Sequence, residues 1–191
     1  MSANAPTSPA GYAPPMRFVY PRRGLQWGSV VLMGLTLPGL MWWTNWWHFA
    51  AAYRLLNIST LDALFMFLIV ILTVIVHEAI HGLVYVWLGY KVTYGLSGQL
   101  GAAFAAAFQQ FQTRNHNLLV ALGPLLVLTP LGLLLLTNSN LFIQRLGFTI
   151  ALFNTGGAIG DIYLTWRLLR LPQDALLYDA NEREMYILLP E

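Results

Sequence analysis

The sequence predicts an all-α membrane protein with about four transmembrane helices, and two observations predict this fold class. First, 57% of the 191 residues are hydrophobic and only 9% are charged, whereas soluble domains carry roughly 25% charged residues. Second, four apolar runs are long enough to cross about 30 Å of hydrocarbon as helices, namely residues 27–47, 61–90, 118–136 and 146–169. So few charges exclude a soluble enzyme and a basic domain that binds nucleic acid.

Local signals mark where these helices begin, end and pack. The first run ends in the tryptophan-rich segment 42–47, which is typical of an aromatic belt at a membrane surface. The second opens with Ser59, and Asp62 in its first turn predicts a helix cap. The fourth carries Gly156 and Gly160, a small-residue spacing that we expect to let this helix approach the second closely.

The composition divides the chain into three parts. Residues 1–24 are rich in Pro, Ala, Ser and Gly, which predicts a flexible cytoplasmic tail. Residues 25–172 form the predicted transmembrane core. Within it, residues 91–113 are too apolar for a free loop and too rich in glycine for a spanning helix, which favours a short hairpin or a re-entrant segment. Residues 173–191 are a second cytoplasmic tail that can form a small hairpin.

The basic residues predict an orientation in the membrane. With four crossings and a cytoplasmic N-terminus, eight Lys and Arg residues lie inside, and only Arg54 and Arg145 lie outside. This distribution follows the positive-inside rule. We therefore expect a multi-pass protein, with both termini cytoplasmic, in the plasma membrane of a prokaryote.

The second run contains ionisable residues that are costly in a membrane. His77 and His81 are four residues apart, so on a helix they lie on the same face and can share one Zn²⁺. Glu78 lies beside them and can take a proton from water, as in the H-E-x-x-H arrangement of zinc peptidases. With no cysteine in the chain, thiolate ligands and thiol nucleophiles are excluded. The alternative is a pair of buried histidines that are satisfied by hydrogen bonds alone.

The fourth run contains two further candidates. Asp161 is the predicted third zinc ligand, because helical rise places it about 9–14 Å before the basic residues that follow it, in the same half of the membrane as the histidines. The alternative is a protonated carboxyl in a polar niche. Asn154 lies two turns before Asp161, where it can position a substrate or make a hydrogen bond between helices.

Taken together, these motifs resemble a known group of enzymes. The H-E-A-I-H-G of residues 77–82, the A-L-G-P of residues 121–124 and the Asn-to-Asp segment 154–161 are similar to the site-2 protease class of intramembrane metallopeptidases. The chain most closely resembles the compact putative zincin peptidase family related to them. The segment 154–161 departs from the site-2 pattern because it lacks proline.

The resemblance has implications for the site. It implies that His77, His81 and Asp161 bind zinc and that Glu78 is the catalytic base. It also implies that residues 91–113 offer an edge strand or a re-entrant loop to an unwound substrate.

Two functions of different classes follow from these patterns. The first is a membrane-embedded zinc metalloendopeptidase that hydrolyses membrane-anchored proteins near the cytoplasmic face. The second is a non-catalytic membrane scaffold or partner-binding subunit that zinc stabilises. A zinc or proton transporter is less favoured, because the ionisable groups converge at one depth instead of following a path. The lipid bilayer is an expected partner, and the oligomeric state stays open.

Overall fold

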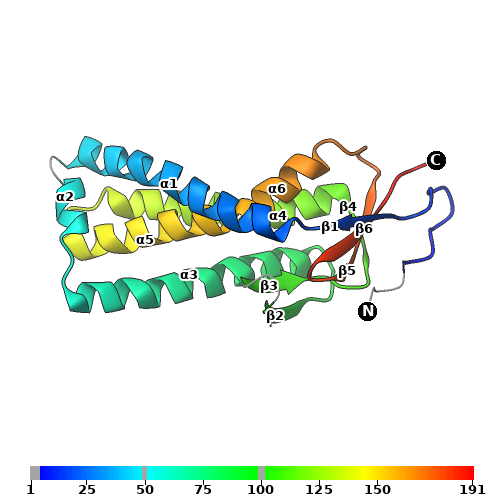
Figure 1. Ribbon diagram of the computed structural model, residues 1–191, viewed down its shortest axis with the longest axis horizontal. Helices are drawn as coiled ribbons and strands as arrows, with labels where there is room; N and C mark the ends of the chain where they lie inside the picture. Colours follow the sequence, from blue (N-terminus) through cyan, green and yellow to red (C-terminus); the bar gives the residue numbers. More distant parts are fainter. Residues whose placement is uncertain (1–4, 49–50, 99–101) are drawn as a thin grey trace. The chain divides into compact units, whose positions relative to one another are not determined.

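The computed structural model describes residues 5–48, 51–98 and 102–191, which form mostly helices together with two antiparallel sheets (Figure 1). The chain divides into two compact units. Unit 1 comprises Met1–Arg23, Glu78–Gly123 and Asp161–Glu191, and unit 2 comprises Gly24–His77 and Pro124–Gly160. Each unit is therefore assembled from segments that are distant in sequence.

Unit 2 is built from helices. Its elements are α1 (Arg22–Trp47), α2 (Ala51–Leu56), the first part of α3 (Thr60–Trp87), most of α4 (Arg114–Leu136) and α5 (Leu141–Gly157). Leu40 of α1, Leu136 of α4 and Phe148 of α5 meet in its core, and each is at most 5% exposed. Small residues allow α4 and α5 to approach closely, because a Cβ added at Gly132 would lie 2.8 Å from Ala151.

Three helices among the described residues, α1, α3 and α4, are long and apolar enough to cross a membrane. Large apolar side chains on α3 are exposed, for example Leu61 at 77%, as expected of a surface that faces lipid. The predicted fourth crossing is not confirmed, because the chain leaves α5 at Ala158 and starts α6 (Ile159–Leu168). Ala158 has ψ near 11°, and the glycines around it have low helix propensity.

The expectation that the glycine pair of the fourth run brings it close to the second run is wrong. A Cβ added at Gly156 would lie 2.1 Å from the side chain of Met33, which belongs to α1. Ser29 of the same helix donates a hydrogen bond of 2.7 Å to the Gly156 carbonyl oxygen. Gly160 has no neighbour within 4 Å of an added Cβ. Gly156 therefore serves the contact with α1.

The expectation of an all-α protein is also wrong, because unit 1 contains two sheets. The larger sheet has the order β1 (Met16–Val19), β6 (Glu184–Leu188), β5 (Leu176–Asn181) and β4 (Phe111–Thr113). It joins strands from both ends of the chain, so Met16–Val19 is paired where the sequence predicted a flexible tail (Figure 1). The strands are short, and their partners are remote in sequence, so hydrophobic periodicity does not reveal them.

The second sheet of unit 1 is a two-stranded ladder of β2 (Thr93–Ser97) and β3 (Ala102–Ala106). It lies between α3 and α4 in the sequence, where a hairpin or a re-entrant segment was expected. The hairpin form of that prediction is confirmed.

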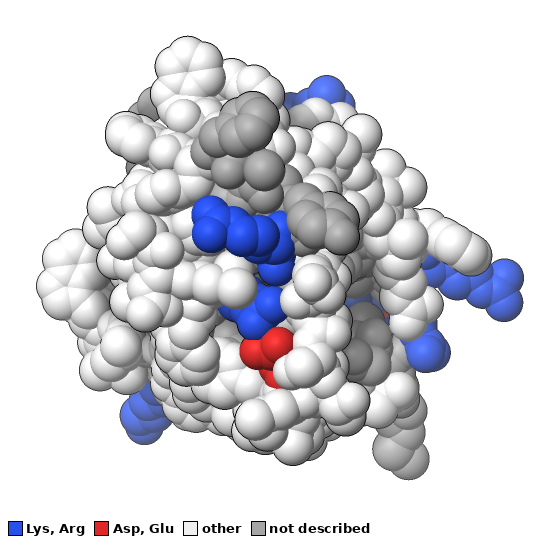
Figure 2. Space-filling view, turned by 90° about the vertical axis from the view of Figure 1, so that its left-hand side faces the viewer, with Lys and Arg blue, Asp and Glu red and all other residues white. Residues whose placement is uncertain are grey.

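Charged residues are rare in unit 2, which contains only Arg54, Asp62 and Arg145. Asp62 accepts hydrogen bonds from the Ser59 backbone N–H and hydroxyl, so the predicted cap of α3 is confirmed. Arg145 lies 2.6 Å from the Asp62 carboxylate and donates to the Asn57 carbonyl oxygen. Figure 2 shows basic and acidic side chains next to each other near the centre of one face, with further basic side chains at its margins.

Candidate metal centre

Three side chains of α3 form a group that can hold a metal ion. His77, Glu78 and His81 each offer one ligand atom, and these atoms all lie within 4.8 Å of one another. His77 is 8% exposed and His81 is 6% exposed. The spacing of four residues puts both imidazoles on one face of a single helix, as the sequence predicts.

A hydrogen bond fixes the ring of His77. Its Nδ1 lies 2.9 Å from Oδ1 of Asn154, which is 1% exposed. The amide nitrogen of Asn154 donates to the Thr129 hydroxyl at 3.0 Å and to the Pro124 carbonyl oxygen at 3.3 Å. These two acceptors orient the amide so that its oxygen faces His77. The Asn154 oxygen can only accept, so Nδ1 of His77 carries a proton, and in the neutral ring Nε2 is then the nitrogen with the lone pair.

The same logic holds for His81. Its Nδ1 lies 2.8 Å from the backbone carbonyl oxygen of Val120 in α4, which can only accept a hydrogen bond. In the neutral ring, Nε2 of His81 is therefore also the nitrogen with the lone pair. That nitrogen lies 3.4 Å from Oδ1 of Asp161 in the first turn of α6. A lone pair and a carboxylate oxygen repel each other at this distance unless a cation or a proton lies near both.

These donors fit a zinc ion. Zinc prefers imidazole nitrogen and carboxylate oxygen, and its histidine ligands normally donate their other ring nitrogen to a carbonyl or an amide oxygen. Both histidines of α3 have such an acceptor on Nδ1. The acceptors around the imidazoles are therefore those that a zinc site requires.

The sequence predicted most of these residues but not the groups that support them. Asp161 lies beside His81, as expected of a ligand from a second helix. Asn154 contacts His77, and its substrate-positioning role stays a prediction. The Val120 carbonyl oxygen carries no signal in the sequence, because every residue has one.

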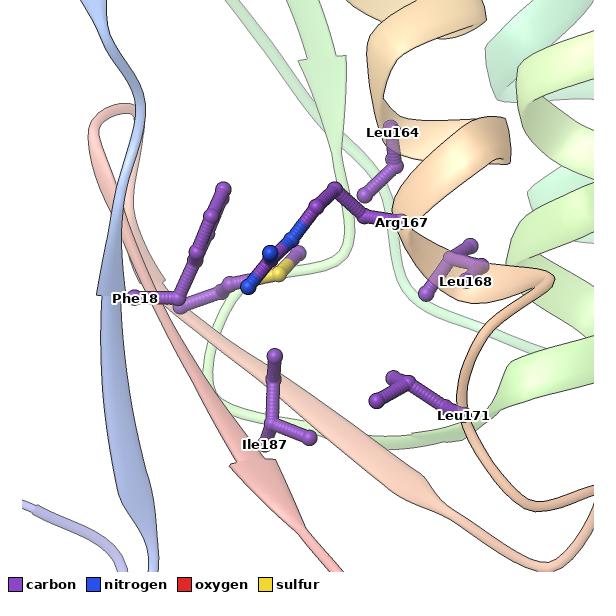
Figure 3. A pocket seen from close by; sticks show the side chains of 7 residues that line it. Phe18, Leu164, Arg167, Leu168, Leu171 and Ile187 are labelled. Carbon is purple, nitrogen blue, oxygen red and sulfur yellow. The ribbon is translucent and has the colours of Figure 1, made fainter.

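A separate hollow in unit 1 does not involve these residues. It is lined mainly by apolar side chains of β1, β6 and α6, and the guanidinium of Arg167 lies 5.3 Å from the ring centre of Phe18 (Figure 3). None of the predicted site residues lines it.

Comparison with known proteins agrees with the chemistry of the donor set. The sequence model of a family described as Putative zincin peptidase matches residues 70–176, more than half of the chain. The chain belongs to this family. The matched segment contains His77, Glu78, His81 and Asp161. No curated protein and no solved structure matches the chain. Membership in a zincin family indicates a zinc metallopeptidase, while the link to site-2 proteases stays a prediction.

Proposed function

We propose that this zincin-family protein is a membrane-embedded zinc endopeptidase that cleaves membrane-anchored proteins near the cytoplasmic face. One observation carries the proposal. Two imidazoles on an apolar helix both donate Nδ1–H to fixed oxygen acceptors, so in the neutral rings Nε2 is the nitrogen that can ligate a metal, and a glutamate lies beside them. Buried histidines that served only packing would not need both rings held in the same tautomer.

In this proposal His77, His81 and Asp161 hold the zinc ion. Bound zinc supplies Lewis-acid chemistry, because it lowers the pKa of water and polarises a peptide carbonyl. Asn154 and the Val120 carbonyl oxygen keep the two imidazoles in the ligating tautomer. The apolar surroundings of α3 exclude bulk water, which strengthens electrostatic interactions in the site.

Glu78 acts as the general base. It lies within 4.8 Å of the ligand atoms of both histidines, so water at the centre is within its reach. Its carboxylate takes a proton from the attacking water and then delivers that proton to the amine of the leaving peptide. The water oxygen bonds to the carbonyl carbon, the C–N bond breaks, and the proton leaves on the amine product, so Glu78 is again ionised for the next cycle.

The charges support the location that we propose. Eight of the ten Lys and Arg residues belong to unit 1, together with Glu78, His81 and Asp161. By the positive-inside rule, unit 1 is then on the cytoplasmic side of the plasma membrane of a prokaryote, with both termini. A substrate anchored in the same membrane meets the centre at that side.

The test compares wild-type protein with Glu78→Gln, both full-length, in detergent and loaded with zinc. The probes are fluorescein-labelled β-casein and a reporter with one transmembrane helix and a labelled cytoplasmic extension. We expect wild type to hydrolyse the reporter, and Glu78→Gln to keep its zinc but lose at least about 100-fold in rate. Equal rates in the two proteins would contradict the proposal. Equal zinc with no hydrolysis by wild type would instead favour the zinc-stabilised scaffold.

A further inference from the structure

Tyr94 of β2 lies directly against the helix that carries the candidate metal centre. A Cβ added at Gly82 would lie 1.8 Å from the Tyr94 hydroxyl oxygen and 2.5 Å from its Cζ. No side chain fits there, so the hydroxyl occupies the space that a residue other than glycine would fill. Because residue 82 is glycine, the Tyr94 side chain can pack directly against α3.

This position is next to the proposed base. Gly82 follows Glu78 by four residues, so both lie on the same face of α3, about 5–6 Å apart at their Cβ positions. Helical side chains lean toward the N-terminus, over the preceding turn. A hydroxyl in place of the Gly82 side chain consequently lies over the turn that contains Glu78.

The Tyr94 hydroxyl is available to a ligand. In the described part of the chain, residues 5–48, 51–98 and 102–191, no group accepts a hydrogen bond from it. The residue is 56% exposed, so other described parts of the protein leave much of its ring uncovered. A hydroxyl that points at a helix without a protein acceptor has an unused donor beside the centre.

The strand that carries Tyr94 is held by its partner strand. Tyr94 pairs with Ala105 and Gly95 pairs with Phe104 across the β2–β3 ladder. The Phe104 ring covers Gly95, where an added Cβ would lie 2.6 Å from the ring. This packing fixes the backbone next to Tyr94, so the hairpin determines where the Tyr94 side chain begins.

We propose that Tyr94 is a further catalytic residue, whose hydroxyl donates a hydrogen bond to the carbonyl oxygen of the scissile peptide as that oxygen gains negative charge. The inference rests on the proposed function. Ionised Glu78 can only accept hydrogen bonds, so a hydrogen bond that assists zinc at this oxygen comes from a separate donor. Phenol hydroxyls donate at neutral pH, and one donor to a developing oxyanion is worth about 100-fold or more in rate.

The test uses Tyr94→Phe in the full-length, zinc-loaded protein, with fluorescein-labelled β-casein as the probe. We expect kcat to fall by about 100-fold while KM stays within about two-fold, because the bond forms mainly in the transition state. Zinc content and the thermal midpoint should not change. Binding of the labelled casein, measured by anisotropy, should be equal in Glu78→Gln and in Glu78→Gln/Tyr94→Phe. The matched control is Tyr178→Phe, on β5, whose ring packs on Phe111.

Each outcome decides one claim. A wild-type rate in Tyr94→Phe, with Glu78→Gln inactive, overturns the role of Tyr94 and leaves the peptidase proposal standing. Loss of zinc or of casein binding in Tyr94→Phe, or an equal rate loss in Tyr178→Phe, assigns Tyr94 to structure and also overturns its role. A wild type no faster than Glu78→Gln overturns the peptidase proposal and this inference with it.

Discussion

Two imidazoles one helical turn apart form a metal site only when each presents a ring-nitrogen lone pair to the same ion. Here Asn154 and the Val120 carbonyl oxygen make this choice, because each accepts a hydrogen bond from Nδ1. At the scale of single residues, the centre thus depends on groups that do not touch the metal. Loss of either hydrogen-bond acceptor should therefore lower the affinity of the site for zinc.

The first prediction concerns Asn154. Asn154→Ala removes the acceptor of His77 Nδ1–H, so His77 loses its fixed tautomer and orientation. We expect the zinc dissociation constant to rise about 10–100-fold, as measured by competition with a chromogenic chelator. Asn115→Ala is the control, since Asn115 is exposed and remote in sequence from α3. An unchanged zinc affinity in Asn154→Ala would contradict the orienting role.

The second prediction distinguishes the proposed role of Asp161 as a zinc ligand from that of Glu78 as a base. We propose that Asp161 is an anionic ligand, so Asp161→Asn, which puts a neutral amide there, should weaken zinc binding by more than the about 10–100-fold expected for a supporting residue. Glu78→Gln should keep its zinc. Zinc per chain is measured by mass spectrometry after dialysis, with the exposed Asp174→Asn as the control. Retention of zinc by Asp161→Asn together with its loss from Glu78→Gln would exchange the two roles.

At the scale of elements, the contact between α3 and the β2–β3 hairpin can be tested through stability. Gly82→Ala forces a methyl group onto the Tyr94 hydroxyl, so we expect a lower thermal midpoint. In a Tyr94→Ala background the space is open, and the higher helix propensity of alanine should raise stability by about 0.5–1 kcal/mol. Additive effects of the two substitutions would mean that the residues do not touch.

The fourth prediction concerns pH and the contact between β5 and β4. Burial raises the pKa of Asp179 to about 6, although Gln112 donates a hydrogen bond of 3.0 Å to its carboxylate and lowers the pKa. Tyr20 and Tyr85 are titratable groups that interact electrostatically with Asp179, and phenols are neutral at this pH.

A raised pKa means that the folded protein binds the proton more tightly than the unfolded chain. The free energy of unfolding should therefore fall as pH rises from about 4 to about 6, by at most about 3 kcal/mol, and then level off. Asp179→Asn should remove this part of the pH dependence. Thermal midpoints of both proteins between pH 4 and pH 8 measure it, and identical curves would contradict the assignment.

At the scale of the whole molecule, the sequence predicted what is local. The three apolar helices follow from continuous hydrophobic runs, and the H-E-x-x-H pair follows from helical spacing. The larger sheet could not be predicted, because β1 at Met16–Val19 pairs with β6 near the other end of the chain. The hydrogen bond between Asn154 and His77 joins residues 77 positions apart, so the sequence pattern could not predict it either.

At the scale of the whole molecule, the charged residues are distributed unevenly between the two units. Unit 2 has three charged residues, and two of them pair with each other. Unit 1 has the other fifteen and contains the sheets. The helical unit is thus suited to lipid and the sheet-bearing unit to water. Glu78, His81 and Asp161 belong to unit 1, which we propose faces the cytoplasm.

The most direct test of the central claim is the zinc-edge X-ray absorption spectrum of the full-length protein. We predict one zinc per chain with a first shell of nitrogen and oxygen at about 2.0–2.1 Å. The multiple scattering should fit two imidazoles, His77 and His81, and it should drop to one imidazole in His81→Ala. A spectrum without imidazole scattering, or one that His81→Ala leaves unchanged, would contradict the claim that α3 holds the catalytic zinc.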